Sequence, residues 1–182
     1  MDKQNFQPTP KLLTDKSRLQ EIYDLRVDVW ENSEKSEFVN RQLFPKGWFD
    51  DLDDTGFHLF IADDQNKIIA AARLNLFNTL NDFPYYKFIS HLNIPAITPF
   101  AFYSRLVVDP SFQGNGLSAK LDFSILDLCK TNNAFWVIGL SSDRTELMVT
   151  KLGFKNYGSA EINYSELSDR HLINVIIKTF QK

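Results

Sequence analysis

FYSRLVVDPSFQGNGLSAKLDFSILDLCK, residues 102–130, is the stretch that decides the fold. Its aromatic and β-branched start, residues 102–108, predicts a buried strand, which Asp109-Pro110 ends. After a short loop, apolar residues recur at the spacing of one helix face, at Leu117, Leu121, Ile125 and Leu128. The stretch therefore predicts a strand, a loop and a helix in succession.

The loop between strand and helix, residues 113–118, contains Gly114 and Gly116. Glycine adopts positive φ and lets the backbone come close to a ligand. A loop that leads into a helix also directs free N–H groups toward one point, and the helix dipole makes that point attractive to anions. The loop lacks the G-x-x-x-x-G-K-S/T pattern and the third glycine of a dinucleotide fingerprint. We therefore expect an anion site of another kind.

This loop resembles the acyl-CoA-binding signature of the GNAT superfamily of N-acetyltransferases, Q/R-x-x-G-x-G/A. Gln113 and Gly116 match, and Ser118 is a small departure at the last position. AFWVIGL at 134–140 resembles the next strand of the family, and KLGFKNYG at 151–158 resembles its K-L-G-F-x-x-x-G ending. The resemblance implies the GNAT fold, an α/β (α+β layered) architecture. That fold has a mixed, mostly antiparallel sheet of about 6–7 strands, with splayed central strands and about four flanking helices.

Composition fits one ordinary globular domain over residues 1–182, with 43% hydrophobic and 24% charged residues. A net charge of −3 argues against a nucleic-acid or anionic-membrane surface. A single cysteine, Cys129, and the absence of a leader or a membrane-spanning run lead us to expect a cytoplasmic protein. Sixteen phenylalanines indicate an aromatic core or an acyl pocket, and we favour the core.

Periodicity and turn residues place the remaining elements. Ser17-Arg18-Leu19-Gln20 has the form of a capping box at the start of the first helix. The apolar, proline-rich segment 78–99 predicts a short helix packed over the sheet, as a lid or pocket wall. We expect strands near 11–14, 57–62, 67–76, 102–108, 134–140, 156–164 and 172–180, and helices near 17–30, 36–44, 85–91, 117–130 and 143–151.

Several residues resemble the autoinducer-synthase-like branch of the family. Arg26 and Trp30 fit its R-x-x-V-F/W helix end, and the aspartates at 50–54 fit its D-x-x-D segment. Arg73 and Arg105 fit two further arginine positions, whereas Tyr103 replaces a glutamate of that branch. Two readings stay open: Arg26, Arg73 and Arg105 form a buried ion-pair network with Asp51, Asp53 or Asp54, or they contact substrate.

The resemblance implies direct transfer of an acyl group from acetyl-CoA, or another acyl-CoA, to a small-molecule amine acceptor. Loop amides would hold the pyrophosphate, and the strand edge would pair with the pantetheine arm. The predicted CoA-binding residues are Leu106, Val107, Val108, Gln113, Gly114, Asn115, Gly116, Leu117 and Ser118. The predicted substrate residues are Arg26, Trp30 and Arg105. We expect no metal, because the histidines lack ligand spacing.

Several residues are candidates for the proton transfers that the reaction needs. An alkyl amine must lose a proton before it attacks, and the candidate bases are Tyr103 with a water or a carboxylate from 50–54. The usual acid of the family is a tyrosine, and Val149 stands at that position here. Ser142 is our replacement, with Ser141 and Tyr157 as alternatives. Cys129 is expected to be structural.

Two other functions stay open. The first alternative is a non-catalytic acyl-CoA-binding domain. The second is an enzyme that transfers a longer acyl chain, as autoinducer-synthase-like enzymes do. We expect a monomer or a homodimer, with neither a nucleic-acid nor a membrane partner.

Overall fold

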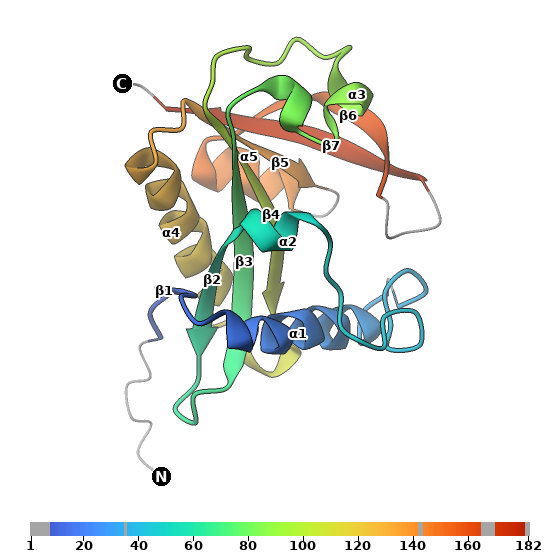
Figure 1. Cartoon of the computed structure of the whole chain (residues 1–182), viewed down its shortest axis with the longest axis vertical. Coiled ribbons are helices and arrows are strands. Elements are labelled where there is room, and N and C mark those ends of the chain that lie inside the picture. The colour runs from blue at the N-terminus through green and yellow to red at the C-terminus, as the bar shows by residue number, and fades with distance from the viewer. Residues whose placement is uncertain (1–7, 35, 142–143, 165–169, 181–182) are drawn as a thin grey trace. The chain divides into compact units, whose positions relative to one another are not determined.

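The computed structural model describes residues 8–34, 36–141, 144–164 and 170–180 (Figure 1). Within them, seven strands form one mixed sheet in the order β1-β2-β3-β4-β5-β7-β6. The pairing of β4 with β5 is parallel, and the pairs β1–β2, β5–β7 and β6–β7 are antiparallel. The strands are β1 Lys11–Leu12, β2 Phe57–Ala62, β3 Ile68–Phe77, β4 Phe100–Val108, β5 Trp136–Ser141, β6 Lys155–Asn163 and β7 Arg170–Thr179.

Five α-helices accompany the sheet in the described residues: α1 Leu19–Glu31, α2 Leu52–Thr55, α3 Tyr86–Ile89, α4 Leu117–Thr131 and α5 Thr145–Leu152. Three short 3-10 helices are η1 Lys16–Arg18, η2 Leu80–Asp82 and η3 Pro110–Phe112. The expected GNAT-like architecture is confirmed, with seven strands and five helices. None of the described helices is both long and apolar enough to cross a membrane.

The chain divides into two compact units. Unit 1 comprises residues 1–73 and 105–125, and unit 2 comprises residues 74–104 and 126–182. Each of the strands β3 and β4 contributes residues to both units. A single domain over 1–182 stays a prediction.

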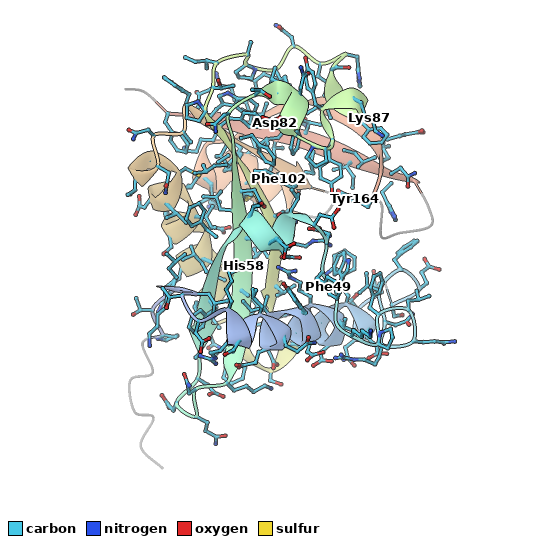
Figure 2. All side chains as sticks on the ribbon, viewed as in Figure 1. Phe49, His58, Asp82, Lys87, Phe102 and Tyr164 are labelled. Atoms are coloured by element: carbon cyan, nitrogen blue, oxygen red, sulfur yellow. The ribbon has the colours of Figure 1, made fainter. Side chains whose placement is uncertain are left out.

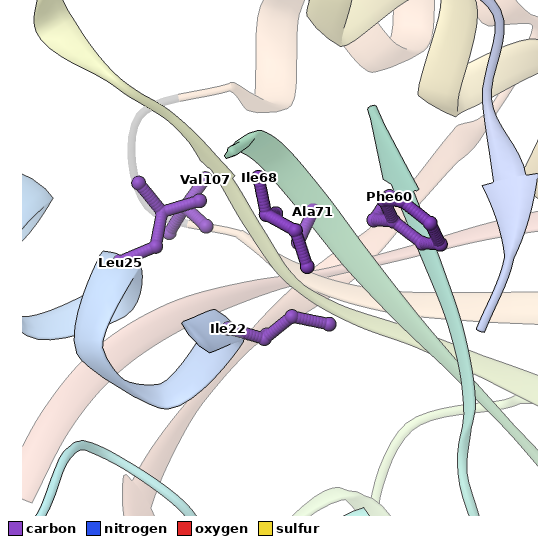
Figure 3. Close-up of a cluster of buried hydrophobic side chains, with 6 residues drawn as sticks. All are labelled: Ile22, Leu25, Phe60, Ile68, Ala71 and Val107. Carbon is purple, nitrogen blue, oxygen red and sulfur yellow. The ribbon is translucent and has the colours of Figure 1, made fainter. Parts of the chain in front are cut away.

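The core of unit 1 lies between α1 and the strands. Ile22 and Leu25 of α1 pack with Phe60 of β2, Ile68 and Ala71 of β3, and Val107 of β4 (Figure 3). The α1 residues stand three apart, the spacing that puts both on one helix face. Burial of this apolar face anchors α1 to the strands that precede the glycine loop.

The core of unit 2 is aromatic. Phe83 of the 78–99 segment contacts the rings of Phe77, Phe100 and Phe102, and Phe100 stacks on Trp136 with ring centroids 4.2 Å apart. The Trp136 Nε1–H donates to the carbonyl of Ile97 at 2.6 Å. The 78–99 segment is therefore packed into the core of this unit, and these phenylalanines serve the core, as we favoured.

Two sequence-based expectations are wrong. Residues 36–44 form turns, in which the side chain of Asn40 bonds back to the Ser36 carbonyl at 2.7 Å and competes with the helical ladder. The capping box is also absent: Arg18 occupies the N-cap of α1 without a side-chain bond. Instead, Asp15 caps η1 by accepting from the Ser17 N–H.

Candidate functional site

The glycine loop presents free backbone donors. Gly114 has a φ of 79° and Gly116 a φ of 71°, and residues 113–116 are exposed. In the described part of the chain, the N–H groups of Gly114, Asn115 and Gly116 have no hydrogen-bond partner. The first hydrogen bond of α4 runs from the Lys120 N–H to the Gly116 carbonyl at 3.1 Å. The N–H groups of the first turn therefore have no acceptor within the helix.

Side chains hold this loop in shape. The Asn115 side-chain amide donates to the Phe112 carbonyl at 3.0 Å, and that of Gln113 donates to the Val108 carbonyl at 3.3 Å. Leu117 is buried, which fixes the first turn of α4. The backbone donors therefore belong to a braced loop that opens into a helix of fifteen residues. Free backbone donors at the start of a helix are the groups that bind phosphate-sized anions in many proteins.

The strand before the loop changes conformation at Arg105. The described pairs of β4 with β5 are Ala101–Val137, Phe102–Ile138 and Tyr103–Gly139. Arg105 then has a φ of 57°, in the left-handed region that a non-glycine residue seldom adopts. Such conformations cost about 1–3 kcal/mol and occur where the surrounding structure imposes them. The backbone of Leu106–Val108 thus follows a local break in the strand geometry.

An arginine–aspartate cluster of unit 1 lies beside this break, and Asp53 is at its centre. Arg26 of α1 binds Asp53 with two hydrogen bonds of 3.0 and 2.9 Å, and Arg73 of β3 lies 2.9 Å from the same carboxylate. Asp50 accepts from both Arg73 and Arg105. The ion-pair alternative is therefore what the structure contains.

The partners differ in part from those expected. Of the three aspartates that we expected, only Asp53 forms ion pairs in the cluster, while Asp51 and Asp54 are exposed. The second carboxylate of the cluster is that of Asp50. Asp50 and Asp53 stand three residues apart at the start of α2, which brings both carboxylates to one side of the turn. The D-x-x-D spacing was the sequence signal for this pair.

The arginines lower the pKa of the two aspartates. Burial acts to raise the pKa of Asp50, but the charges and hydrogen bonds of Arg105 and Arg73 outweigh it and hold the pKa well below its usual range. Burial opposes the charge of Asp53 in the same way, and Arg26 and Arg73 lower its pKa. A carboxylate with a low pKa is a weak base. The two aspartates are thus poor candidates for deprotonating an amine.

His58 of β2 completes the buried cluster (Figure 2). Its Nε2 lies 3.1 Å from the backbone carbonyl of Asp53, to which it donates as a neutral ring. Burial lowers the pKa of His58. The ring is therefore neutral at pH 7 and adds no charge to the cluster.

Trp48 joins the cluster to an aromatic group. The guanidinium of Arg105 lies over its ring, 3.9 Å from the centroid, and Trp30 meets it edge-on at 5.1 Å. The Trp48 carbonyl accepts from Arg26 at 3.1 Å. Sequence reasoning named Trp30 but missed Trp48. The available signal was the aromatic pair Trp48-Phe49 directly before the acidic cluster at 50–54.

The predicted substrate residues differ in accessibility. The side chain of Arg26 has no exposed surface, that of Arg105 is 8% exposed, and Trp30 is half-buried. In this conformation Arg26 stabilises the cluster and has no surface to offer a ligand. Contact of Arg105 or Trp30 with a substrate stays a prediction.

Tyr103, one of the two predicted catalytic residues, lies in unit 2. Tyr103 is buried on β4 opposite Gly139, and Ser142 lies outside the described residues. The Ser141 hydroxyl accepts from the Arg144 N–H at 3.2 Å, and Val149 is half-buried on α5. Their roles in proton transfer stay predictions.

Two further kinds of reactive group are the cysteine and clusters of metal ligands. Cys129 is buried, and burial raises the pKa of its thiol to about 12. Such a thiol is a poor nucleophile. Among the described residues, no group of three or more His, Cys, Asp or Glu side chains has a geometry suited to a metal ion.

Comparisons with known proteins cover most of the chain. The sequence profile of the acetyltransferase (GNAT) family matches residues 19–154. No curated protein matched the chain in sequence.

Solved structures share the fold at low identity. One is described as histone acetyltransferase HPA2 and related acetyltransferase from Corynebacterium glutamicum; it is 16% identical, with a TM-score of 0.61 over 96% of this chain and 97% of its own. BjaI, a CoA-dependent acyl-homoserine lactone synthase solved with SAM and isopentyl-CoA, is 12% identical, with a TM-score of 0.70 over 96% and 85%. FeeM, an N-acyl amino acid synthase from uncultured soil microbes, is 12% identical, with a TM-score of 0.58 over 93% and 91%. These likenesses concern the fold alone.

Proposed function

The chain belongs to the acetyltransferase (GNAT) family, and we propose that it transfers an acetyl or other short acyl group from acyl-CoA to the amine of a small molecule. One observation carries the proposal: the unpartnered N–H groups of Gly114, Asn115 and Gly116 at the start of α4. They supply donors of the kind that the pyrophosphate of CoA needs. BjaI, of similar fold, was solved with an acyl-CoA, which supports this choice of donor.

In the proposed reaction, acyl-CoA and the amine are bound together. The backbone of Leu106–Val108 pairs with the pantetheine amides as an added strand would. The amine nitrogen attacks the thioester carbon, a C–N bond forms, and the C–S bond breaks. The thiolate leaves and takes up a proton, and the attacking nitrogen loses one. Placing the two reactants together supplies most of the rate gain.

The irregular backbone at Arg105 has a specific role in this proposal. A positive φ changes the direction of the peptide groups that follow it. In this proposal, an N–H near Leu106 or Val107 donates to the thioester oxygen. A fixed donor at that oxygen stabilises the charge that develops there, and loss of one such donor costs about 10²–10³ in kcat. Because Asp50 and Asp53 are weak bases, Tyr103 with a water is our candidate for removing the proton from the amine.

Thiol release from acetyl-CoA across a panel of amines tests the proposal. We expect saturable CoA binding by calorimetry and thiol release that depends on at least one amine. Absence of CoA binding by the folded protein would refute the proposed function.

A second candidate is a non-catalytic acyl-CoA-binding domain. It is favoured by Val149, which has no hydroxyl at the position where the family usually carries its acid. Tight CoA binding without thiol release for any amine would favour this function. Competition among acyl-CoAs of increasing chain length separates a short-chain enzyme from a longer-chain one of the autoinducer-synthase-like type.

A further inference from the structure

Asn115 of the glycine loop is the one asparagine of the sequence that precedes a glycine, Gly116. The side-chain amide of an asparagine reacts with the backbone nitrogen of the next residue, which closes a cyclic imide and releases ammonia. A side chain on that next residue hinders the approach, and glycine has none. Both residues are exposed, and a Cβ at Gly116 would have no atom within 4 Å. The two reacting groups are thus open to water and uncrowded.

The backbone nitrogen that attacks is also available. In the described part of the chain, the N–H of Gly116 has no hydrogen-bond partner. Asn66 is exposed too, in the loop between β2 and β3, but the N–H that follows it, of Lys67, donates to the Asp63 carboxylate at 2.9 Å. A bonded N–H has to give up its acceptor before it reacts, which costs free energy. The structure therefore favours reaction at Asn115 over reaction at Asn66.

The side chain of Asn115 makes two hydrogen bonds that leave it exposed. Its amide nitrogen donates to the carbonyl of Phe112 at 3.0 Å and to that of Gln113 at 3.4 Å. This nitrogen is the atom that leaves as ammonia. Because the loop is exposed, water takes the place of both acceptors when the amide turns. Neither bond buries the carboxamide against the rest of the protein.

We infer that Asn115 is a modification site, at which deamidation places a negative charge in the glycine loop. A base from solvent removes the proton of the Gly116 N–H, and this nitrogen attacks Cγ of Asn115. The new N–C bond forms while the bond from Cγ to Nδ2 breaks, and Nδ2 takes up a proton from water and leaves as ammonia. Water then opens the imide, which leaves an aspartate or an isoaspartate at position 115. Water is the only co-reactant.

The consequence of this charge rests on the proposed function. The new carboxylate belongs to the residue between Gly114 and Gly116, whose N–H groups are proposed to bind a phosphate of CoA, and like charges repel. Bound CoA should in turn protect the site, because the Gly116 N–H then donates to the phosphate. Deamidation thus inactivates molecules that remain without CoA.

Mass spectrometry tests the site directly. The full chain is incubated in mildly alkaline buffer, and the peptides that contain Asn115 and Asn66 are followed for the gain in mass when an amide becomes a carboxyl group. We expect Asn115 to deamidate at least about tenfold faster than Asn66, since a barrier lower by about 1.4 kcal/mol gives that ratio.

Gly116→Ala hinders the attack, and Gly114→Ala is its matched control. The two glycines have φ values of 71° and 79°, and a Cβ at either meets no atom within 4 Å, so the two variants carry a similar backbone cost. We expect Gly116→Ala to deamidate at Asn115 at least about tenfold more slowly than the wild type. Gly114→Ala should stay within about twofold of the wild type, because the nitrogen of Gly116 is unchanged.

Calorimetry then measures the effect on CoA. Deamidated protein should bind CoA at least about tenfold more weakly than freshly purified protein, and Asn115→Asp should reproduce the loss. CoA at about 100 times its Kd should slow the deamidation of the wild type at least about tenfold, because few molecules then have a free loop.

Each contrary outcome has a distinct meaning. Equal rates at Asn115 and Asn66 overturn the inference, as do equal rates in the wild type and in folded Gly116→Ala. In a protein that binds CoA, unchanged affinity after deamidation overturns the role of the charge. Failure of the fresh, folded wild type to bind CoA refutes the proposed function instead, and the mass measurement still decides whether Asn115 is modified.

Discussion

Gly116→Glu tests the anion site directly. A Cβ at Gly116 would have no atom within 4 Å, so the first carbon of a new side chain stands in open space. The cost to folding comes from the φ of 71°, which an L-residue adopts at about 1–2 kcal/mol. Part of that cost is offset because the unfolded chain loses the freedom of glycine. For a chain of this length we expect Tm to fall by about 2–4 °C.

The effect on CoA binding should be far larger. We take a separation of about 4 Å between the new carboxylate and a phosphate bound to the N–H of residue 116, at which two charges near a surface repel by about 4 kcal/mol. Screening at physiological salt reduces this, and about 2–3 kcal/mol remains. We therefore expect CoA to bind about 30- to 150-fold more weakly, as measured by calorimetry.

Two further variants separate the contributions. Gly116→Gln has the shape of the glutamate without its charge, so the difference between the two isolates the repulsion. Gly153 also has a φ of 71°, at the C-cap of α5, and its Cβ would meet only the end of the Lys178 side chain. Gly153→Ala thus reproduces the backbone cost away from the loop and should leave CoA binding unchanged. Undiminished CoA affinity in folded Gly116→Glu would refute the assignment of the loop.

Three other predictions concern buried groups. Asp53→Asn leaves Arg26 without its charged partner and should lower the free energy of unfolding in urea by about 3–5 kcal/mol; the exposed Asp54→Asn is the control, and equal effects of the two would contradict the role of the cluster. The pKa of His58 is lowered by burial from 6.5 and that of Asp53 is lowered from 3.8, so the unfolded chain binds more protons as pH falls. The free energy of unfolding should then be constant above pH 7 and decline below about pH 6.5, as His58 of the unfolded chain takes up a proton. Below about pH 5 it should fall more steeply, because the contribution of Asp53 is lost. A urea midpoint independent of pH from 7 to 4 would contradict this prediction. Because Cys129 is buried with a pKa of about 12, a thiol reagent at pH 8 should label it only when the protein unfolds. Rapid labelling of the folded protein would contradict the burial of Cys129 on α4.

Local sequence signals predicted the elements that carry the proposed CoA site. The hairpin strands β2 and β3 and the unit from β4 through α4 agree with the expected ranges within about two residues, the usual uncertainty of element ends. The helix expected at 36–44 is wrong, because this largely polar segment contains Asn40, whose side chain bonds locally in a turn. In short polar segments of this kind, side-chain hydrogen bonds set the backbone conformation, and the spacing of apolar residues does not reveal them.

The arginine–aspartate cluster shows where the sequence was insufficient. Burial of Arg26, Arg73 and Arg105 required carboxylates, and the acidic run at 50–54 was the expected source. The choice of Asp50 and Asp53 among the aspartates depends on the turn of α2 and on strands distant in sequence. The same holds for Trp48, whose contacts with Arg105 and Arg26 span 57 and 22 residues (105 − 48 and 48 − 26).

The sequence by itself determined the strand, glycine loop and helix of residues 102–131, because periodicity and glycine act over a few neighbouring residues. It also determined the family, through motifs that are local in the same sense. Only the tertiary structure decided which aspartate pairs with which arginine and that Arg105 lies on the ring of Trp48. These depend on the positions of segments far apart in the chain, where burial and charge, rather than local preference, set the free energy.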